Sequence, residues 1–285
     1  MGRVVVGVDS SPVAARALER ALLEAERRQD QLTVFRAWLP PVWVGASLGQ
    51  TYSYDAMSAE VSSAQEAKRE AAEMAEKALS ATGASVVTDV RVEEGQPGPL
   101  LVDISRDADL LVVGTRGRNA LVDGIFGRAA TYVTHHAACP VLLVPSSSEP
   151  ISPYRRVVVG VDGSTPSLAA LRWAHRVSQE EGRPLVALHV HPYGRLPRDV
   201  EPELGDARAW LAQLVTRELG VGAATCEVEA GAPSEGVLKA IGDEDLLVLG
   251  ARGKGGFAGL HLGSVADQCA RHAPCAVAIV RGVTG

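Results

Sequence analysis

The sequence predicts two tandem α/β sandwiches, each built on a five-stranded parallel sheet, and three observations carry this prediction. The chain has 285 residues, which corresponds to about two domains of roughly 150 residues each. The segment Arg3–Asp9 recurs letter for letter at residues 156–162, so the chain is an internal duplication. Within each copy, short apolar runs alternate with stretches of helical periodicity, which is the pattern of βαβ units.

The composition is that of a chain that folds around a hydrophobic core. Hydrophobic residues make up 46% and charged residues 22%, which argues against disorder, collagen and coiled coil. The net charge is −6 and the basic residues are scattered, so no nucleic acid partner is expected. Apolar runs fall short of the ~18 residues that span a bilayer, and the first residues lack the apolar stretch of a signal peptide. We therefore expect no membrane partner and a cytoplasmic location.

Each copy begins with a strand and a capped helix. Val4–Val8 is a short β-branched run of the kind that is buried on both faces of a parallel sheet, and it ends at Asp9. Ser11 then supplies a helix N-cap and Pro12 a proline at the first helical position. Thr165–Pro166 repeats this helix start in the second copy.

The remaining elements follow in the same order in both copies. After the second strand come a polar-faced helix, a third strand, a shorter helix, a fourth strand, a glycine-rich loop, a last helix and a last strand. The ranges assigned by pattern are Leu32–Trp38 and Leu185–His191 for the second strands, about Val61–Thr82 and about Ala207–Leu219 for the helices, strands ending at Gly114 and Gly250, and last strands Pro140–Val144 and Ala276–Val280. Right-handed crossovers between such strands give a flavodoxin-like or Rossmann-like sandwich.

The two copies differ in length and are joined by a linker. The fourth-strand match places Gly250 136 residues after Gly114, so the first copy is 17 residues longer between the two repeated landmarks. We expect the surplus in Trp38–Ser63, where prolines and glycines interrupt regular patterns. Residues 145–153 are rich in proline and serine, as linkers are. The predicted domains are therefore 1–147 and 148–285.

A ligand site is expected at the carboxyl ends of the strands in each copy. Asp9 and Asp162 end the first strands, and the loops that begin at Gly114 and Gly250 follow the fourth. If strands one and four are neighbours, each carboxylate faces a glycine-rich loop across a crevice. Glycines let backbone N–H groups approach a phosphate, and a helix N-terminus attracts anions. The alternative is that Ser264 is only an N-cap, the loop is only flexible, and nothing binds.

At these residues the chain resembles the universal stress protein family in its tandem two-domain form. The nucleotide-binding members carry Gly-x2-Gly-x9-Gly-Ser/Thr, and Gly250, Gly253, Gly263 and Ser264 match every element. The resemblance implies ATP, with Mg, as the ligand, and two domains that pair through their last strands as a pseudo-dimer. The residues expected to bind it in the second copy are Asp162 at the adenine or ribose end, Val190 beside adenine, and Gly250, Gly253, Gly263 and Ser264 at the phosphates, with Arg252 and Val265 as further binding residues.

The first copy departs from this motif. Arg128 stands where serine or threonine is expected, although the glycine spacing is kept. A guanidinium at a helix N-terminus can be a strong phosphate partner, or its bulk can fill the pocket and its charge oppose the helix dipole. The corresponding binding residues are Asp9, Ala37, Gly114, Arg116, Gly117, Gly127 and Arg128.

Other signals are weaker, and for each the structural interpretation is preferred. The stretch 45–49 matches a nucleophile elbow but lacks the strand and helix which that motif needs. His189 and His191 share one face of a strand, without an evident third metal ligand. Aromatic residues near position 50 could form a lid. Four cysteines without a CxxC pair are expected as buried thiols of a reducing compartment: Cys139, Cys226, Cys269 and Cys275.

The function predicted from these patterns is that of an ATP-binding regulator or sensor in the stress response. Bound nucleotide would order the glycine loop and last helix and change a surface presented to an unknown protein partner. A homodimer is expected. The alternatives are a weak ATPase or phosphotransferase, with at most slow ATP hydrolysis, and an interaction module that binds no nucleotide. We expect no dedicated catalytic residues, because no constellation of base, metal-holding acids and nucleophile surrounds the loop.

Overall fold

The computed structural model describes residues 2–39, 54–115, 126–146, 151–192, 200–253 and 261–282. In these parts of the chain, ten strands form one sheet. The strands are β1 (Arg3–Gly7), β2 (Gln31–Trp38), β3 (Thr88–Glu94), β4 (Leu110–Gly114), β5 (Val141–Val144), β6 (Val157–Gly160), β7 (Leu185–His191), β8 (Thr225–Ala230), β9 (Leu246–Gly250) and β10 (Ala276–Val280). The helices are α1 (Pro12–Arg28), α2 (Tyr54–Thr82), α3 (Pro97–Ile104), the short η1 (Ser105–Asp107), α4 (Arg128–His136), α5 (Thr165–Glu181), α6 (Val200–Leu219), α7 (Pro233–Ala240) and α8 (Ser264–His272).

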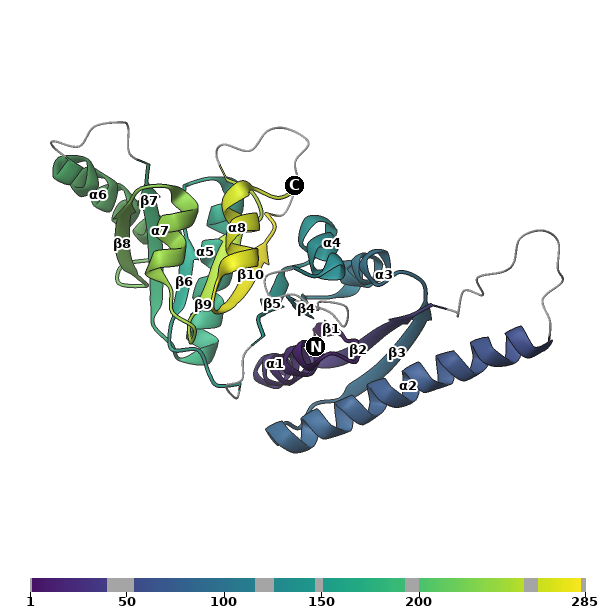
Figure 1. Ribbon diagram of the computed structural model, residues 1–285. Coiled ribbons are helices and arrows are strands. Elements are labelled where there is room, and N and C mark those ends of the chain that lie inside the picture. The colour runs from purple at the N-terminus through teal and green to yellow at the C-terminus, as the bar shows by residue number, and fades with distance from the viewer. Residues whose placement is uncertain are drawn as a thin grey trace, which may run out of the picture.

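The strand order is β3-β2-β1-β4-β5-β10-β9-β6-β7-β8, with the two halves side by side (Figure 1). Within each half the strands are parallel, and the first strand lies next to the fourth. The order 3-2-1-4-5 in each half is that of a Rossmann-like sheet, whose strand order reverses between strands one and four. The predicted fold and the predicted neighbourhood of strands one and four are both confirmed.

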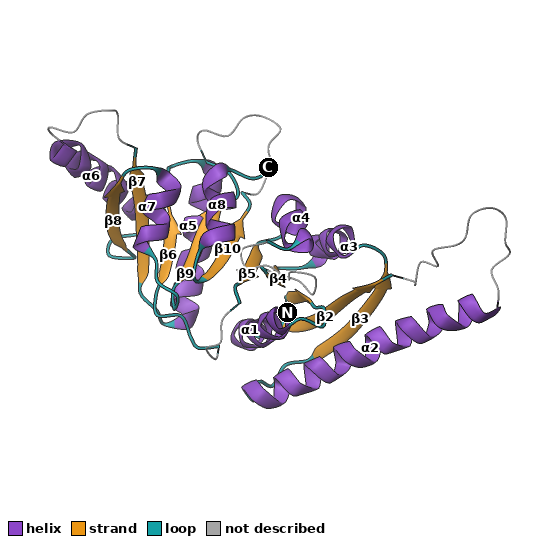
Figure 2. Ribbon diagram, in the orientation of Figure 1, coloured by secondary structure: helices purple, strands orange, loops and turns teal. Residues whose placement is uncertain are grey.

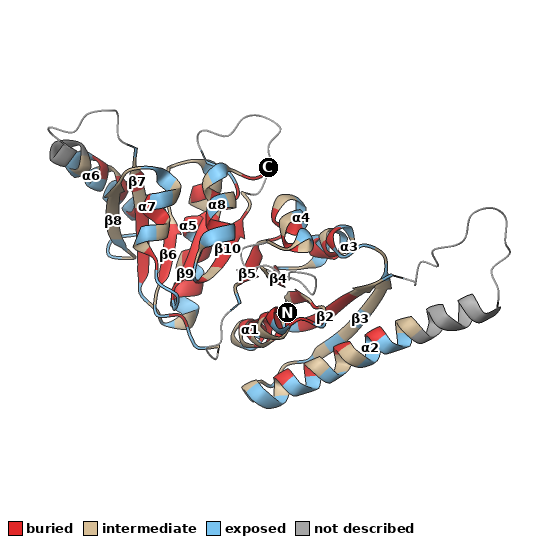
Figure 3. Ribbon diagram, viewed as in Figure 1, coloured by how far each residue is buried: buried red, intermediate tan, exposed pale blue. Residues whose placement is uncertain are grey.

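Helices cover both faces of this sheet (Figure 2). Alternate residues of a strand point to opposite faces, so Val4 and Val6 belong to one hydrophobic core and Val5 to the other. The first core is closed by α1, α2, α5 and α6, and the second by α3, α4, α7 and α8. Each core contains residues of both halves, and the buried strands run through the middle of the molecule (Figure 3).

The halves are joined by antiparallel pairing of β5 with β10. Leu142 lies opposite Ala278, and these two residues hold equivalent positions in the duplication. An approximate twofold axis therefore passes between them, as in a symmetric dimer. The expectation that the last strands pair and remove each other's open edges is confirmed.

A buried cluster of charges lies where α1 meets α5. Arg27 forms ion pairs with Glu24 of its own helix and with Glu180 of α5, and its Nε lies 3.1 Å from Glu181 Oε1. The side chain of Glu24 is only 2% exposed. Burial raises the pKa of Glu24, but Arg27, Arg28 and Arg20 outweigh burial and hold the pKa below its usual value.

The structure corrects three local predictions. Helix α6 begins at Val200, before its predicted start at about Ala207. The segment Trp38–Ser63 is not irregular to its end, because α2 already begins at Tyr54, where alanine, methionine and glutamate favour helix. The second N-cap is Ser164 instead of Thr165, and its hydroxyl accepts a hydrogen bond from the N–H of Ser167. Residues 45–49, with the elbow pattern, lie outside the described residues. Among those described, no helix is both long and apolar enough to cross a membrane.

We predict that Glu24→Gln lowers the free energy of unfolding by about 3 kcal/mol at pH 7, because it leaves buried arginines without their counter-charge. Since the folded pKa of Glu24 is lowered, its contribution is present above the unfolded pKa of about 4.3. The contribution is lost as the pH falls through the folded value. Urea unfolding at several pH values measures the free energy of unfolding of wild type and variant. The difference between the two free energies should become smaller in acid.

The matched control is Glu66→Gln, which removes a carboxylate from α2. Glu66 forms an ion pair of 2.9 Å with Arg69, and both side chains are about 60% exposed. An exposed pair of this kind contributes little to stability, so the urea midpoint should stay unchanged. If the free energies of unfolding of wild type and Glu24→Gln differ by the same amount at pH 7 and in acid, then lost packing, and not lost charge, destabilises the variant.

Candidate functional site

A cavity of about 680 Å³ opens at the carboxyl ends of β6, β7 and β9 in the second half. This volume lies within the range of roughly 300–1,000 Å³ that is typical of small-molecule sites. The cavity collects every residue predicted for the second site. Its walls include Asp162, Val190, Gly250, Arg252, Gly253, Gly263, Ser264 and Val265. They also include His189, for which the sequence favours a structural role, and four residues that the sequence does not indicate: Ser167, Pro192, Pro233 and Val237.

Asp162 links the end of β6 to the glycine loop. Its Oδ1 accepts a hydrogen bond of 2.9 Å from the N–H of Ser164, which fixes the turn into α5. Its Oδ2 would lie 2.5 Å from a Cβ placed on Gly253. A side chain at this position would force the carboxylate to shift, and the carboxylate and the loop come together as the sequence predicts.

Gly250 is required by packing. A Cβ at this position would lie 2.7 Å from the carbonyl carbon of Pro166 and 2.8 Å from the nitrogen of Ser167. Both atoms belong to the backbone at the start of α5, which cannot move away cheaply. The first glycine of the motif therefore lets the end of β9 approach α5, and this approach sets one wall of the cavity.

The N-terminus of α8 points its free N–H groups at the cavity. Its N-cap is Gly263, and no side chain among the described residues caps it, whereas Ser164 caps α5. The N–H of Gly263 donates to the carbonyl of Ala251 over 2.7 Å, which anchors the loop. The first N–H groups of a helix have no partner within the helix, so an uncapped terminus suits an anionic ligand.

The opposite end of the cavity is apolar and closely packed. Val190, Leu188 and Val237 line it, and a Cβ on Gly236 would lie 2.7 Å from Val190. This approach of α7 to β7 forms a narrow apolar wall. Such a wall suits a flat, largely apolar group such as a nucleobase.

His189 serves the structure of this region. Its Nδ1 lies 2.8 Å from the carbonyl oxygen of Val161, and its ring meets Trp210 edge-on with centroids 4.8 Å apart. The ring of His191 is 6.3 Å away. No group of three or more His, Cys, Asp or Glu residues within the described ranges could hold a metal ion.

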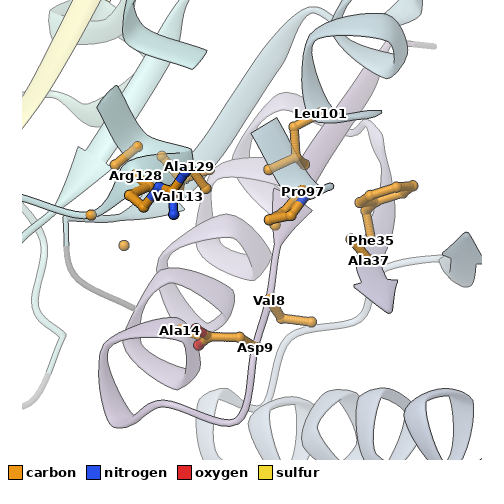
Figure 4. A pocket seen from close by; sticks show the side chains of 14 residues that line it. Val8, Asp9, Ala14, Phe35, Ala37, Pro97, Leu101, Val113, Arg128 and Ala129 are labelled. Carbon is orange, nitrogen blue, oxygen red and sulfur yellow. The ribbon is translucent and has the colours of Figure 1, made fainter. Parts of the chain in front are cut away.

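The first half has a much smaller cavity of about 150 Å³ at the equivalent place. It brings together the predicted residues Asp9, Ala37, Gly114, Gly127 and Arg128. Arg116 and Gly117 lie outside the described residues, in 116–125. Phe35 and Arg128 lie at opposite sides of the pocket (Figure 4). These two positions hold Leu188 and Ser264 in the second half, so bulkier side chains line the smaller cavity.

The four cysteines are free thiols. Burial raises the pKa of Cys139, Cys269 and Cys275 to about 12, so these thiols stay protonated at neutral pH. Burial also raises the pKa of Cys226. Nucleophilic chemistry needs a thiolate, and the structure therefore gives none of the four cysteines such a role.

Comparisons with known proteins agree over the whole chain. A model described as the universal stress protein family matches residues 1–145 and 153–281. Universal stress protein Rv1996 of Mycobacterium tuberculosis is 30% identical over 310 residues, covering 98% of this chain and 94% of its own. A universal stress protein of Mycolicibacterium smegmatis is 31% identical over 290 residues, covering 98% and 96%. The crystal structure of a universal stress protein from Archaeoglobus fulgidus superimposes with a TM-score of 0.69 at 20% identity, covering 99% and 96%.

We predict that Gly250→Ala lowers the free energy of unfolding by about 2 kcal/mol, because the new methyl group overlaps the backbone of α5. Chemical denaturation measures this loss. The control is Gly205→Ala in α6, where a Cβ would meet no atom within 4 Å and alanine favours the helix. That variant should be as stable as wild type or slightly more so. Equal stability of Gly250→Ala and wild type would contradict the packing role.

Proposed function

We propose, from the premise that this chain belongs to the universal stress protein family, that its second half binds ATP and that the protein acts as a regulator or sensor in the stress response. The observation that carries the proposal is the 680 Å³ cavity with an uncapped helix N-terminus at one end and an apolar wall at the other. A polyanionic tail and an apolar base are the two halves of an adenine nucleotide.

The phosphate end of the proposed site rests on backbone donors. The free N–H groups of Ser264 and Val265 at the start of α8 would donate to phosphate oxygens. The Ser264 hydroxyl adds another donor, and the exposed Arg252 side chain adds positive charge. The positive end of the α8 dipole favours an anion at the same point.

The base and sugar end rests on Asp162 and the wall around Val190. A carboxylate accepts hydrogen bonds from ribose hydroxyls, and the apolar wall would hold the adenine ring. Asp162 is the one carboxylate among the described residues that line the cavity. Mg²⁺ would therefore be held chiefly by the phosphates and water, as this ion commonly is in nucleotide sites.

The side chains around the phosphate end of the cavity favour binding of nucleotide without dedicated catalysis. The polar side chains there, Ser264 and Arg252, can orient phosphate and balance its charge, but charge stabilisation serves binding as well as turnover. A slow ATPase or phosphotransferase is the rival proposal. Phosphate release from labelled ATP well above background, abolished by Ser264→Ala, would favour the rival.

Nucleotide binding would also affect how the protein meets its partners. Nucleotide bound against Gly253 and Gly263 would change the surface beside α8, and a protein partner that prefers the bound form would recognise this change. The outer strands β3 and β8 end the sheet, so their edges are the places where a second chain would add to it. A homodimer in the cytoplasm is part of the proposal.

We predict that Asp162→Asn weakens binding of Mg-ATP by about tenfold to a hundredfold in isothermal titration calorimetry. The amide oxygen can still accept the hydrogen bond from the Ser164 N–H, so the turn is kept while the negative charge is lost. A hydrogen bond to a charged group contributes about 1.5–3 kcal/mol, which corresponds to that range of affinity.

Asp9→Asn in the first pocket is the matched control, since Asp9 accepts the same turn hydrogen bond, from the N–H of Ser11. We expect it to leave binding unchanged, because the first cavity of about 150 Å³ lies below the usual size of a small-molecule site. Wild-type protein that is folded and gives no heat with millimolar Mg-ATP would overturn the proposed function. Equal losses in both variants would place nucleotide in both halves.

A further inference from the structure

We propose that Arg281 is a positioning residue for the second cavity, and that it couples ligand binding there to helix α4 of the first half. The inference rests on the proposed function and deepens it, because it makes the site of one half depend on a helix of the other.

Arg281 bridges the two halves directly after β10. One terminal nitrogen of its guanidinium donates to the carbonyl oxygen of Thr134 over 2.6 Å. The other donates to the carbonyl oxygen of His261 over 3.4 Å. Thr134 lies in the last turn of α4, where carbonyls lack a partner within the helix and a cation is favoured by the dipole. His261 lies in the second half, two residues before the N-cap of α8.

Aromatic contacts strengthen the same bridge. The ring of His136 in α4 lies 4.8 Å from the ring of His261 and 4.6 Å from the ring of Tyr132. A reciprocal contact places the guanidinium of Arg271 in α8 5.2 Å from the ring centre of Phe126, which precedes α4. The segment in front of each closing helix therefore rests on the closing helix of the other half.

The bridge ends at the phosphate end of the second cavity. Gly263 both anchors the loop on Ala251 and lines the cavity. Burial lowers the pKa of Arg281, and the neighbouring charge of Arg252 lowers it further, so two guanidinium groups lie near each other beside the loop. An anion bound there would relieve their repulsion, and this relief would draw Arg281 and the loop together.

Among the described residues, a guanidinium bridge of this kind follows β10 but not β5. The position equivalent to Arg281 in the first half is Pro145, which has no side-chain donor. The contact of Phe126 with Arg271 is kept on the first side, but Pro145 cannot form the pair of hydrogen bonds that Arg281 forms. If ligand binding strengthens the contact of Arg281 with α4 by some factor, then α4 is held more firmly in the bound state. By thermodynamic linkage, the same contact raises the affinity for the ligand by that factor.

Hydrogen exchange measured by mass spectrometry, with and without saturating Mg-ATP, tests this coupling in the full chain. In wild type we expect ATP to slow amide exchange at least threefold in both α8 and α4. In Arg281→Met, which keeps an unbranched, flexible side chain but removes the hydrogen-bond donors, protection of α8 should remain and protection of α4 should disappear. Affinity for ATP should fall about tenfold.

The matched control is Arg106→Met, which removes an exposed arginine whose partner is Asp103 at 3.4 Å. It should bind and protect like wild type. If Arg281→Met does not fold by circular dichroism, Arg281→Lys replaces it, because an ammonium group offers no rigid fork to two carbonyls and ligand-dependent protection of α4 should still be lost.

The outcomes separate this inference from the proposed function. Wild type without protection of α8 and without calorimetric heat would mean that the cavity binds no ATP. Protection of α8 with an unchanged α4 in wild type, or ATP-dependent protection of α4 that is equal in wild type and Arg281→Met, would overturn the positioning role of Arg281 while leaving nucleotide binding intact.

Discussion

The pairing of β5 with β10 is the constraint on which the rest of this molecule depends. All four residues of β5 are buried, as are four of the five in β10. A half standing alone would therefore expose an apolar edge with unpaired N–H and C=O groups, which favours aggregation. Joining the two edges makes one sheet of the ten described strands and forces α1 against α5. It also brings the segments in front of α4 and α8 onto the helices of the opposite half.

A duplicated chain can make this contact specific in a way that two identical subunits cannot. Near the pseudo-twofold axis equivalent residues face each other, and here they differ: Leu142 meets Ala278, and Arg27 meets Glu180. Two identical first halves would set leucine against leucine and arginine against arginine. Unfavourable contacts in the wrong pairing give specificity, so these differences favour pairing within one chain.

Much of this organisation could be predicted from the sequence, because the duplication shows each local pattern twice. The β-branched runs fixed the strands, and the meeting of Asp162 with Gly253 followed once strands one and four were neighbours. The structural role of His189 was also predicted, whereas the packing role of Gly250 and the contact of Arg281 with Thr134 could not be predicted. Each depends on distances between segments far apart in the chain, which no local pattern encodes. The early start of α2 was missed because nearby prolines and glycines masked good helix formers.

The two closing helices show how duplicated elements can take different roles. Helix α8 begins with Ser264, whose side chain is uncharged, and the acid in its first turn, Asp267, forms an ion pair with Arg271. No side-chain charge at its first position therefore interferes with an anion that approaches its N–H groups. Helix α4 begins with Arg128, whose charge opposes the helix dipole and whose bulk lines the small cavity. The C-terminal end of α4 is the better complemented end, since Arg281 binds Thr134 there. The geometry suits α8 for holding a ligand and α4 for supporting the loop that holds it.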